Sequence, residues 1–310
     1  MKNKILVALQ TFGEYGDRPR KILNESGLEV RYNTLGHRLA PEEIIELGVD
    51  CEGIIAGVEP YNEMVLNRLI GLQCLSRCGV GLDNIDLKVA QARGITILNT
   101  PEAVIQPVAE MTLALAFDLL RRLTQHTRSL QSGRWKRYAG HLLSGRKVGI
   151  VGLGRIGKRT AELFRSLGAE VYGYDIKPDR DWSRKTGVSL LGLEELLGSV
   201  EILSLHVALS EQAPFKLGRV EIFKLRKGCL LINTSRGQVI DEGALYEALK
   251  TGQVGGAGLD VFSQEPYSGP LLELENVVLT PHVSTLTEES RTEMEFQAAN
   301  NLLRHFGLLK

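Results

Sequence analysis

The sequence carries no net charge, because its 37 Lys and Arg residues equal its 37 Asp and Glu residues. Without an excess of positive charge there is no long-range field to attract a polyanion, so we do not expect nucleic acid as a partner. Long apolar runs are missing too, and no segment reaches the roughly 20 residues that a membrane-spanning helix needs. We therefore expect no membrane partner.

The N-terminus lacks the features of a secretory signal peptide. It has a charged start and a short apolar run, Ile5 to Leu9, which invites that interpretation. Gln10 and the polar residues 14–20 end the run, and no small-residue cleavage site follows. A first β-strand is the better interpretation, and we expect a cytoplasmic protein.

Cysteines are few, and they lack the spacing of metal sites. The four cysteines lie in apolar surroundings, and none forms a CxxC pair or a Cys/His cluster with zinc spacing. Free cysteine is among the most buried residue types. We predict no metal site and four buried small side chains: Cys51, Cys74, Cys78 and Cys229.

What the sequence does contain is an alternation of short Val/Ile/Leu runs with amphipathic stretches of helix length. This alternation indicates βαβ units and parallel sheets, and 310 residues suffice for about two domains of about 100 to 200 residues each. A single long helix is predicted from Pro107 to about Leu130, with proline in its first turn. In the first part, strands are predicted near residues 4–9, 28–32, 53–56, 73–76 and 95–98.

A second series of elements begins at Gly145. Six strands with intervening helices fit a doubly wound dinucleotide-binding sheet. They are predicted near residues 147–151, 170–174, 201–205, 229–232, 256–260 and 277–279. A last helix, Glu288 to about Phe306, is expected to pack on the first domain and make it discontinuous. The fold class is thus α/β with two doubly wound parallel-sheet domains, residues 1–100 with 282–310 and residues 101–281.

Three glycines with GxGxxG spacing stand between a predicted strand and a predicted helix. Gly152 permits a tight turn, Gly154 lets the backbone approach a pyrophosphate, and Gly157 allows close packing of helix on strand. The alternative is a glycine-rich turn of any α/β protein. Asp175, at the end of the next strand, can accept both hydroxyls of an adenine ribose and favours NAD over NADP. Lys177 could weaken that preference.

Arg236 follows the strand 229–232 on a turn that ends in Gly237. Ligands of open α/β sheets bind at the carboxyl ends of the strands, and a guanidinium there can hold a carboxylate by two parallel hydrogen bonds. The alternative is a surface arginine that caps a helix.

His282 also follows a strand, behind a proline, and is a candidate acid/base. Glu265 follows another strand end and could orient the imidazole and stabilise the imidazolium. Asp260 is either a strand-end cap or a contact to a nicotinamide. His206 ends a strand, and its backbone is expected to line the cofactor site.

Together these motifs resemble the D-isomer-specific 2-hydroxyacid dehydrogenase family over nearly the whole chain. The segments that carry the resemblance are Arg77–Asp86, Asn99–Pro101, Val108–Glu110, Val151–Gly157, Asn233–Gly237, Leu259–Pro266, Pro270–Leu272 and Thr280–His282. The resemblance implies a flavodoxin-like substrate domain and a Rossmann NAD-binding domain with a cleft between them. It also implies a homodimer.

The resemblance also implies roles for individual residues. Catalysis would fall to Arg236, Glu265 and His282. The substrate carboxylate would be held by backbone N–H groups of Gly79, Val80 and Gly81, together with Arg236. The NAD cofactor would contact Arg155 and Ile156 at the pyrophosphate and Thr234 and Asp260 at the nicotinamide.

Within the family the chain is most similar to 3-phosphoglycerate dehydrogenases, and we expect it to lack their C-terminal regulatory domain. The predicted reaction is the interconversion of 3-phosphoglycerate and 3-phosphohydroxypyruvate. One departure is that Gly57 to Pro60 stand where many of those enzymes carry a phosphate-binding arginine. This favours the alternative of a glyoxylate or hydroxypyruvate reductase. An NAD-sensing corepressor-like scaffold is an alternative of another class, against which the intact catalytic set argues.

Overall fold

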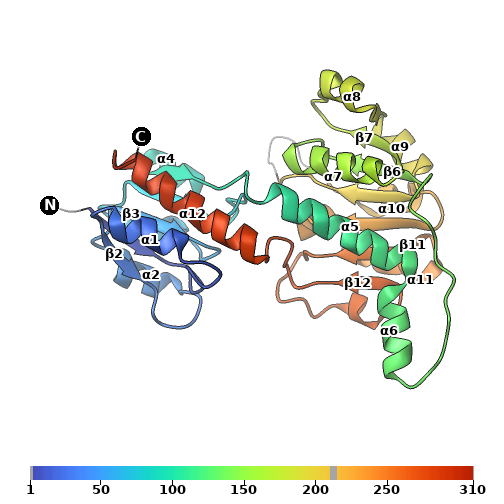
Figure 1. The fold of residues 1–310 in the computed structure, drawn as a ribbon, viewed down its shortest axis with the longest axis horizontal. Coiled ribbons are helices and arrows are strands. Elements are labelled where there is room, and N and C mark those ends of the chain that lie inside the picture. Colours follow the sequence, from blue (N-terminus) through green and yellow to red (C-terminus); the bar gives the residue numbers. More distant parts are fainter. Residues whose placement is uncertain (1–2, 210–214, 310) are drawn as a thin grey trace. The chain divides into compact units, whose positions relative to one another are not determined.

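The computed structural model describes residues 3–209 and 215–309. The chain forms two compact units, which we call unit 1 (Met1–Val104 with Thr285–Lys310) and unit 2 (Ile105–Ser284). Each unit holds one parallel sheet with helices on it (Figure 1). This confirms the predicted fold class of two doubly wound α/β units. In the described ranges, no helix has the length and apolar character to cross a membrane.

Unit 1 has a five-stranded parallel sheet in the order β2-β1-β3-β4-β5. This is the flavodoxin-like order, in which the direction of winding reverses between β1 and β3. Its central strands are apolar because helices cover both faces, and every residue of β3 is buried. The strands are β1 (Lys4–Val7), β2 (Glu29–Tyr32), β3 (Gly53–Ala56), β4 (Cys74–Arg77) and β5 (Thr96–Leu98).

The C-terminal helix α12 (Glu288–His305) belongs to unit 1, where it packs on β3, β4 and α1. Thr287 begins it by accepting a hydrogen bond from the Ser290 N–H. Its own residues Ala298, Ala299 and Leu302 are completely buried. The other helices of this unit are α1 (Arg18–Glu25), α2 (Pro41–Gly48), α3 (Glu63–Arg68) and α4 (Leu87–Ala92).

Unit 2 has a seven-stranded parallel sheet in the order β12-β11-β10-β9-β6-β7-β8. This is the dinucleotide-binding order with β12 added at one edge. The sequence predicted six of these strands and missed β8, an edge strand of only two residues. The strands are β6 (Lys147–Val151), β7 (Glu170–Tyr174), β8 (Ser189–Leu190), β9 (Ile202–Leu205), β10 (Cys229–Asn233), β11 (Val254–Leu259) and β12 (Val277–Leu279).

Two apolar cores lie on the two faces of this sheet. Leu115 of α5 and Phe164 of α7 belong to one core, and the two helices contact each other. Leu196 of α9, Ile222 of α10 and Leu245 of α11 belong to the other. The helices are α5 (Ile105–Arg121), α6 (Leu123–Gln131), α7 (Arg155–Ser166), α8 (Arg180–Thr186), α9 (Leu193–Ser199), α10 (Arg219–Lys224) and α11 (Glu242–Thr251), with 3₁₀ turns at Gly237–Val239 and Pro270–Glu273.

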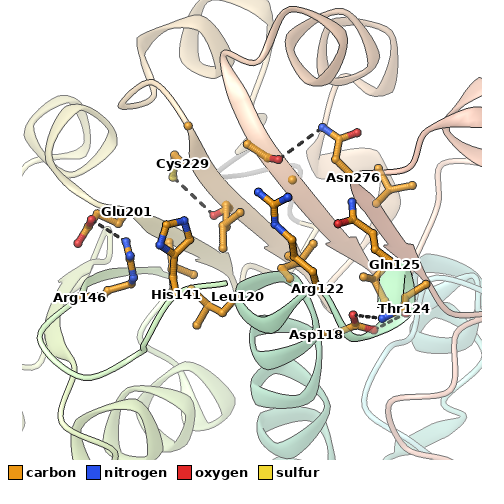
Figure 2. A pocket seen from close by; sticks show the side chains of 18 of the residues that line it. Asp118, Leu120, Arg122, Thr124, Gln125, His141, Arg146, Glu201, Cys229 and Asn276 are labelled. Carbon is orange, nitrogen blue, oxygen red and sulfur yellow. Dashed lines mark hydrogen bonds and ion pairs between the residues drawn. The ribbon is translucent and has the colours of Figure 1, made fainter. Parts of the chain in front are cut away.

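The single helix predicted from Pro107 to Leu130 is wrong, because the chain breaks it at Arg122. This residue adopts the left-handed conformation, with φ 55° and ψ 39°, which ends α5. Asp118 then accepts hydrogen bonds from the N–H (2.9 Å) and the hydroxyl of Thr124, which caps the start of α6 (Figure 2). The apolar periodicity continues across the break, so the pattern by itself does not show it.

The four cysteines are free and buried, as predicted. Burial raises the pKa of the Cys51 thiol to about 11 and those of Cys74, Cys78 and Cys229 to about 12. These thiols therefore stay protonated and serve as small packing groups.

Candidate active site

The glycine-rich turn connects β6 to α7, and two of its glycines are required by close backbone contacts. Gly152 has φ +91°, and a Cβ added to it would lie 2.4 Å from the carbonyl oxygen of His206. A Cβ added to Gly157 would lie 1.9 Å from the carbonyl oxygen of Gly152. Any larger residue at either position would push the strand and the helix apart.

Gly154 differs, because no atom of the described residues lies within 4 Å of the Cβ that it lacks. It is the N-cap of α7, and as a glycine it has no side chain to cap this helix. The backbone N–H groups of a first helical turn have no acceptor within the helix, and a helix N-terminus attracts phosphate oxygens. The open space before Gly154 and the uncapped helix therefore fit the pyrophosphate of a dinucleotide, which is what the sequence predicted for Arg155 and Ile156.

Asp175 stands just after β7, and its carboxylate is held at both oxygens. One oxygen accepts a hydrogen bond from the Leu153 N–H and the other from the Lys177 N–H, each at 2.7 Å. The first bond ties the carboxylate to the glycine-rich turn. Each oxygen keeps a second lone pair, which suits a pair of ribose hydroxyls.

His206 lies just after β9, and its carbonyl group abuts Gly152 as described above. Its ring Nε2 lies 2.8 Å from the Ser204 hydroxyl. Burial lowers the pKa of His206 to about 3, so the ring is neutral at physiological pH. This ring packs beside the turn and brings no charge to it.

Thr234, the predicted nicotinamide contact, is buried after β10. Its hydroxyl oxygen lies 3.0 Å from that of Thr112, which bonds to the carbonyl of Val108 in α5. Since Thr112 has one hydroxyl proton and Val108 accepts it, Thr234 donates to Thr112 and keeps its own lone pairs. The structure thus places Thr234 directly after β10. Its contact with the nicotinamide stays a prediction.

His282 and Glu265 form a hydrogen-bonded pair in unit 2. The Nδ1 of His282 lies 2.8 Å from Oε2 of Glu265. The second carboxylate oxygen accepts a hydrogen bond from the Phe262 N–H at 3.0 Å. The side chains of His282 and Glu265 are 50% and 38% exposed. With Nδ1 occupied, Nε2 is the ring nitrogen that remains for proton transfer.

Asp260 holds the turn that carries His282. Its buried carboxylate accepts hydrogen bonds from the Thr280 hydroxyl (2.6 Å) and from the N–H groups of Val283 and Ser284 (2.8 Å each). The Ser284 hydroxyl donates a fourth bond. His282, enclosed by these bonds, has φ 54°, a conformation that a residue other than glycine keeps only when its surroundings require it.

These hydrogen bonds are those of a strand-end cap, and the nicotinamide contact of Asp260 stays a prediction. Two hydrogen bonds to each carboxylate oxygen use the roughly four lone-pair sites that a carboxylate offers. A nicotinamide contact at this group would require one of these bonds to be given up. Asp260 acts on His282 through the backbone.

Arg236 is placed by its neighbour Asn233, which is almost fully buried. The Asn233 side chain accepts hydrogen bonds from the N–H and the hydroxyl of Ser235 and donates one to the Arg236 carbonyl at 2.8 Å. A Cβ on Gly237 would lie 1.8 Å from the carbonyl carbon of Phe262. The Arg236 turn is therefore packed against the segment that leads to Glu265.

The three predicted catalytic residues follow adjacent strands at the same edge of the sheet. Arg236 comes after β10, Glu265 after β11 and His282 after β12, and these strands are hydrogen-bonded neighbours. A cationic fork and an oriented imidazole are what proton transfer to or from a carboxylate-bearing substrate requires. Sequence reasoning missed Asn233 and Ser284, although an Asn at a strand end before Thr-Ser is a signal for a side-chain-to-backbone turn.

In unit 1, one of the three amides predicted to hold the substrate carboxylate has a hydrogen-bond partner within the chain. Gly79 has φ +133°, and its N–H donates a hydrogen bond to the Thr100 hydroxyl at 2.7 Å. This amide is therefore already engaged, because the threonine of the Asn-Thr-Pro motif reaches it. For the N–H groups of Val80 and Gly81, the described part of the chain shows no hydrogen-bond partner.

Comparison with known families and proteins gives a consistent result. Residues 113–284 match the family described as "D-isomer specific 2-hydroxyacid dehydrogenase, NAD binding domain". A glyoxylate reductase of Korarchaeum cryptofilum is 38% identical over 269 residues, which cover 84% of this chain and 81% of that protein. A D-3-phosphoglycerate dehydrogenase of Methanocaldococcus jannaschii is 38% identical over 277 residues, 87% of this chain and 52% of that protein.

The chain thus spans about half the length of the D-3-phosphoglycerate dehydrogenase that it matches. Among solved structures, a protein of Thermus thermophilus is similar with a TM-score of 0.88 and 33% identity. That similarity covers 99% of this chain and 98% of the other.

Proposed function

The chain belongs to the D-isomer specific 2-hydroxyacid dehydrogenase family, and on that premise we propose that it interconverts a D-2-hydroxy acid and its 2-oxo acid with NAD. The observation that carries this proposal is the Glu265–His282 hydrogen bond at the sheet edge that also bears Arg236. Bound NAD supplies the acceptor for the hydride that leaves C2. Residues of this chain bind the substrate and transfer the proton.

In the oxidation direction, Arg236 binds the substrate carboxylate, and Nε2 of His282 accepts the hydroxyl proton while C2 loses its hydride. Glu265 keeps the imidazole oriented and stabilises the imidazolium that forms. In the reduction direction, the same Nε2 returns the proton to the carbonyl oxygen. Much of the rate comes from positioning, since a misplacement of about 1 Å can cost about a hundredfold.

We assign cofactor binding and the Arg236 contact with the substrate carboxylate to unit 2. The uncapped α7 N-terminus at Gly154 would hold the pyrophosphate, and Asp175 would hold the adenine ribose and exclude a 2′-phosphate. In unit 1, the N–H groups of Val80 and Gly81 would serve the substrate carboxylate. A comparison of kcat/KM with NADH and NADPH, for the wild type and Asp175→Ala, tests the nucleotide assignment.

For the substrate, 3-phosphohydroxypyruvate is the first candidate and hydroxypyruvate or glyoxylate the second. The second has a structural observation in its favour. Glu59 is 3% exposed, and its carboxylate accepts a hydrogen bond from the Gly57 N–H at 2.7 Å. A buried carboxylate at the end of β3 disfavours a phosphate nearby, because like charges repel.

The rate at which NADH absorbance is lost, measured with 3-phosphohydroxypyruvate and with hydroxypyruvate, decides between the two candidates. A kcat/KM at least about tenfold higher for 3-phosphohydroxypyruvate supports the first candidate, and the reverse supports the second. Turnover of neither acid, nor of glyoxylate, would contradict the reductase proposal for these substrates. The homodimer and the cytoplasmic location are part of the same proposal. Sedimentation velocity tests whether the protein is a dimer.

A further inference from the structure

In unit 1 the residues Gly79, Val80 and Gly81, which we call the amide loop, follow the end of β4. The neighbouring strand β5 leads directly into Asn99 and Thr100. Because β4 and β5 are hydrogen-bonded parallel neighbours, their carboxyl ends meet at the same edge of the sheet. The segment 99–100 and the amide loop therefore lie against each other within unit 1.

Thr100 forms a reciprocal pair of hydrogen bonds with Gly79. Its N–H donates to the Gly79 carbonyl at 3.0 Å, and its hydroxyl oxygen accepts a hydrogen bond from the Gly79 N–H at 2.7 Å. Thr100 is completely buried, so water does not compete for these bonds. The pair fixes the backbone of Gly79 on both sides of its Cα.

Asn99 holds the next residue of the amide loop. Its Nδ2 donates a hydrogen bond to the Val80 carbonyl at 3.0 Å. The Asn99 carbonyl in turn accepts a hydrogen bond from Nδ2 of Asn301 in α12 at 3.0 Å, and the same Nδ2 lies 3.2 Å from the Ser76 hydroxyl oxygen. The C-terminal helix thus anchors the segment that holds the loop.

These bonds determine the direction of the two N–H groups that follow. A peptide unit is planar, and in its trans form the C=O and the N–H point in opposite directions. The peptide bonds of the amide loop are trans, because the cis bond of the described residues lies elsewhere in the chain. The carbonyls of Gly79 and Val80 face the segment 99–100, so the N–H groups of Val80 and Gly81 point away from it.

The N–H groups of Val80 and Gly81 are therefore both oriented and available. Within residues 3–209 and 215–309, neither of them donates a hydrogen bond. Successive backbone N–H groups in such a turn form a concavity that binds anions. Donors that are fixed before the ligand arrives need no reorganisation when it binds.

We propose that Asn99 and Thr100 are positioning residues, which orient the amides of Val80 and Gly81 for the carboxylate of the 2-oxo acid. Neither side chain touches the substrate, and Asn301 supports both from α12. The inference rests on the proposed function, because it concerns what sets the substrate amides of that same site. Since the contact is with the carboxylate, it serves every 2-oxo acid alike, whatever group C2 carries.

Steady-state kinetics of the full chain with NADH tests the role of Thr100. Thr100→Val removes the hydroxyl acceptor and keeps the shape, so KM for hydroxypyruvate should rise about tenfold or more. The affinity for NADH should stay within about twofold, because the glycine-rich turn lies in unit 2. Thr100→Ser keeps the hydroxyl and should return KM to within about threefold of the wild type.

A second pair of variants tests Asn99 and its support. Asn99→Leu should raise KM for hydroxypyruvate and for glyoxylate by the same factor, because both acids carry the carboxylate. Asn301→Leu acts through Asn99 and should raise KM by a smaller factor. Asn67→Leu in α3 and Thr96→Val in β5 are matched controls in unit 1, and both should keep the KM of the wild type.

Binding of oxamate, a carboxylate that is not reduced, separates this inference from the proposed reaction. In isotope-labelled protein with NADH, oxamate should shift the backbone amide NMR resonances of Val80 and Gly81 more than that of Gly79. Thr100→Val should bind oxamate about tenfold more weakly. These shifts without turnover of any 2-oxo acid would refute the reaction and leave the amide site standing.

Three results would overturn the positioning role. One is an unchanged KM in folded Thr100→Val and Asn99→Leu, and another is a Thr100→Ser variant as impaired as Thr100→Val. The third is that oxamate leaves the resonances of Val80 and Gly81 unmoved, whether or not the wild type reduces a 2-oxo acid.

Discussion

The Nδ1 of His282 lies 2.8 Å from Oε2 of Glu265, although 17 residues separate them in the chain. The contact exists because parallel strands β11 and β12 are neighbours and end at the same edge. Asp260, directly after β11, accepts hydrogen bonds from the Thr280 hydroxyl and the Val283 N–H, on either side of His282. One carboxylate thus orients the imidazole ring, and the other sets the backbone that carries it.

His282→Ala should lower kcat by about a hundredfold to ten-thousandfold, the usual contribution of a positioned acid/base. The affinity for NADH should stay within about twofold of the wild type, because the glycine-rich turn is untouched. Steady-state kinetics and fluorescence titration with NADH measure the two quantities. Near-normal turnover would refute the acid/base role, and a similar change at the exposed His305 serves as a control.

Asp260→Asn should lower kcat and destabilise the fold, although we place no substrate on Asp260. An amide offers one acceptor oxygen where the carboxylate offers two, so N–H or O–H donors of the 280–284 turn lose a partner. The expected loss is about 2–3 kcal/mol of unfolding free energy. Ser284→Ala removes only one donor and should cost less in both measurements, and unchanged kcat in folded Asp260→Asn would contradict the positioning role.

Gly154→Ala and Gly157→Ala should behave in opposite ways. A methyl group at Gly154 meets no atom of residues 3–209 and 215–309 within 4 Å, so the variant should fold with a melting temperature near that of the wild type. Its affinity for NADH should nevertheless fall at least about tenfold, because the methyl group fills the space assigned to the pyrophosphate. Gly157→Ala would collide with the Gly152 carbonyl at 1.9 Å and should lose stability. Equal NADH affinity of Gly154→Ala and wild type would contradict the cofactor assignment.

Unfolding free energy should decrease between pH 7 and pH 5, with His206 as one cause. Its pKa is lowered by burial to about 3 in the folded protein, whereas in the unfolded chain an imidazole titrates near about 6.5. Between these values the unfolded state binds a proton that the folded state does not, so stability falls as the pH falls. The expected contribution is about 2 kcal/mol between pH 7 and pH 5.

Urea unfolding of wild type and His206→Asn at both pH values measures this contribution, and the variant should show the smaller pH dependence. Asp50, whose pKa is lowered to about 2 mainly by its hydrogen bonds to Arg31 and Lys4, also loses stabilisation on acidification. The pKa of an aspartate in the unfolded chain is about 4. Asp50 therefore changes the unfolding free energy mainly at pH values below the interval from 7 to 5. Identical pH dependence of both proteins would show that the pKa of His206 is not lowered in the folded protein.

The GxGxxG segment was predictable in part because the constraint on Gly157 is local. Gly152 and Gly157 lie close together in the chain, and the clash that excludes a side chain at Gly157 involves the carbonyl of Gly152. Strand and helix on either side have clear periodicities of their own. Short-range sterics therefore leave a mark on the sequence that needs no knowledge of the rest of the chain.

The break at Arg122 was not predictable in the same way. Both α5 and α6 have apolar faces, and the residues around the break are ordinary helix formers. The capping bonds from Asp118 and the fit of the chain at the edge of the sheet decide it. The engaged amide of Gly79 is a similar case, because Thr100 reaches it from the end of another strand.

By itself the sequence determined the alternation of strands and helices and the dinucleotide turn, and it predicted the arginine, glutamate and histidine of the proposed site. These follow from periodicity, local sterics and residue chemistry, which act over a few residues. Only the tertiary structure decided that Asp260 caps the His282 turn, and that Asn99 and Thr100 hold the amide loop. Such relationships join distant parts of the chain, because the strand order of a parallel sheet brings together ends that the sequence keeps apart.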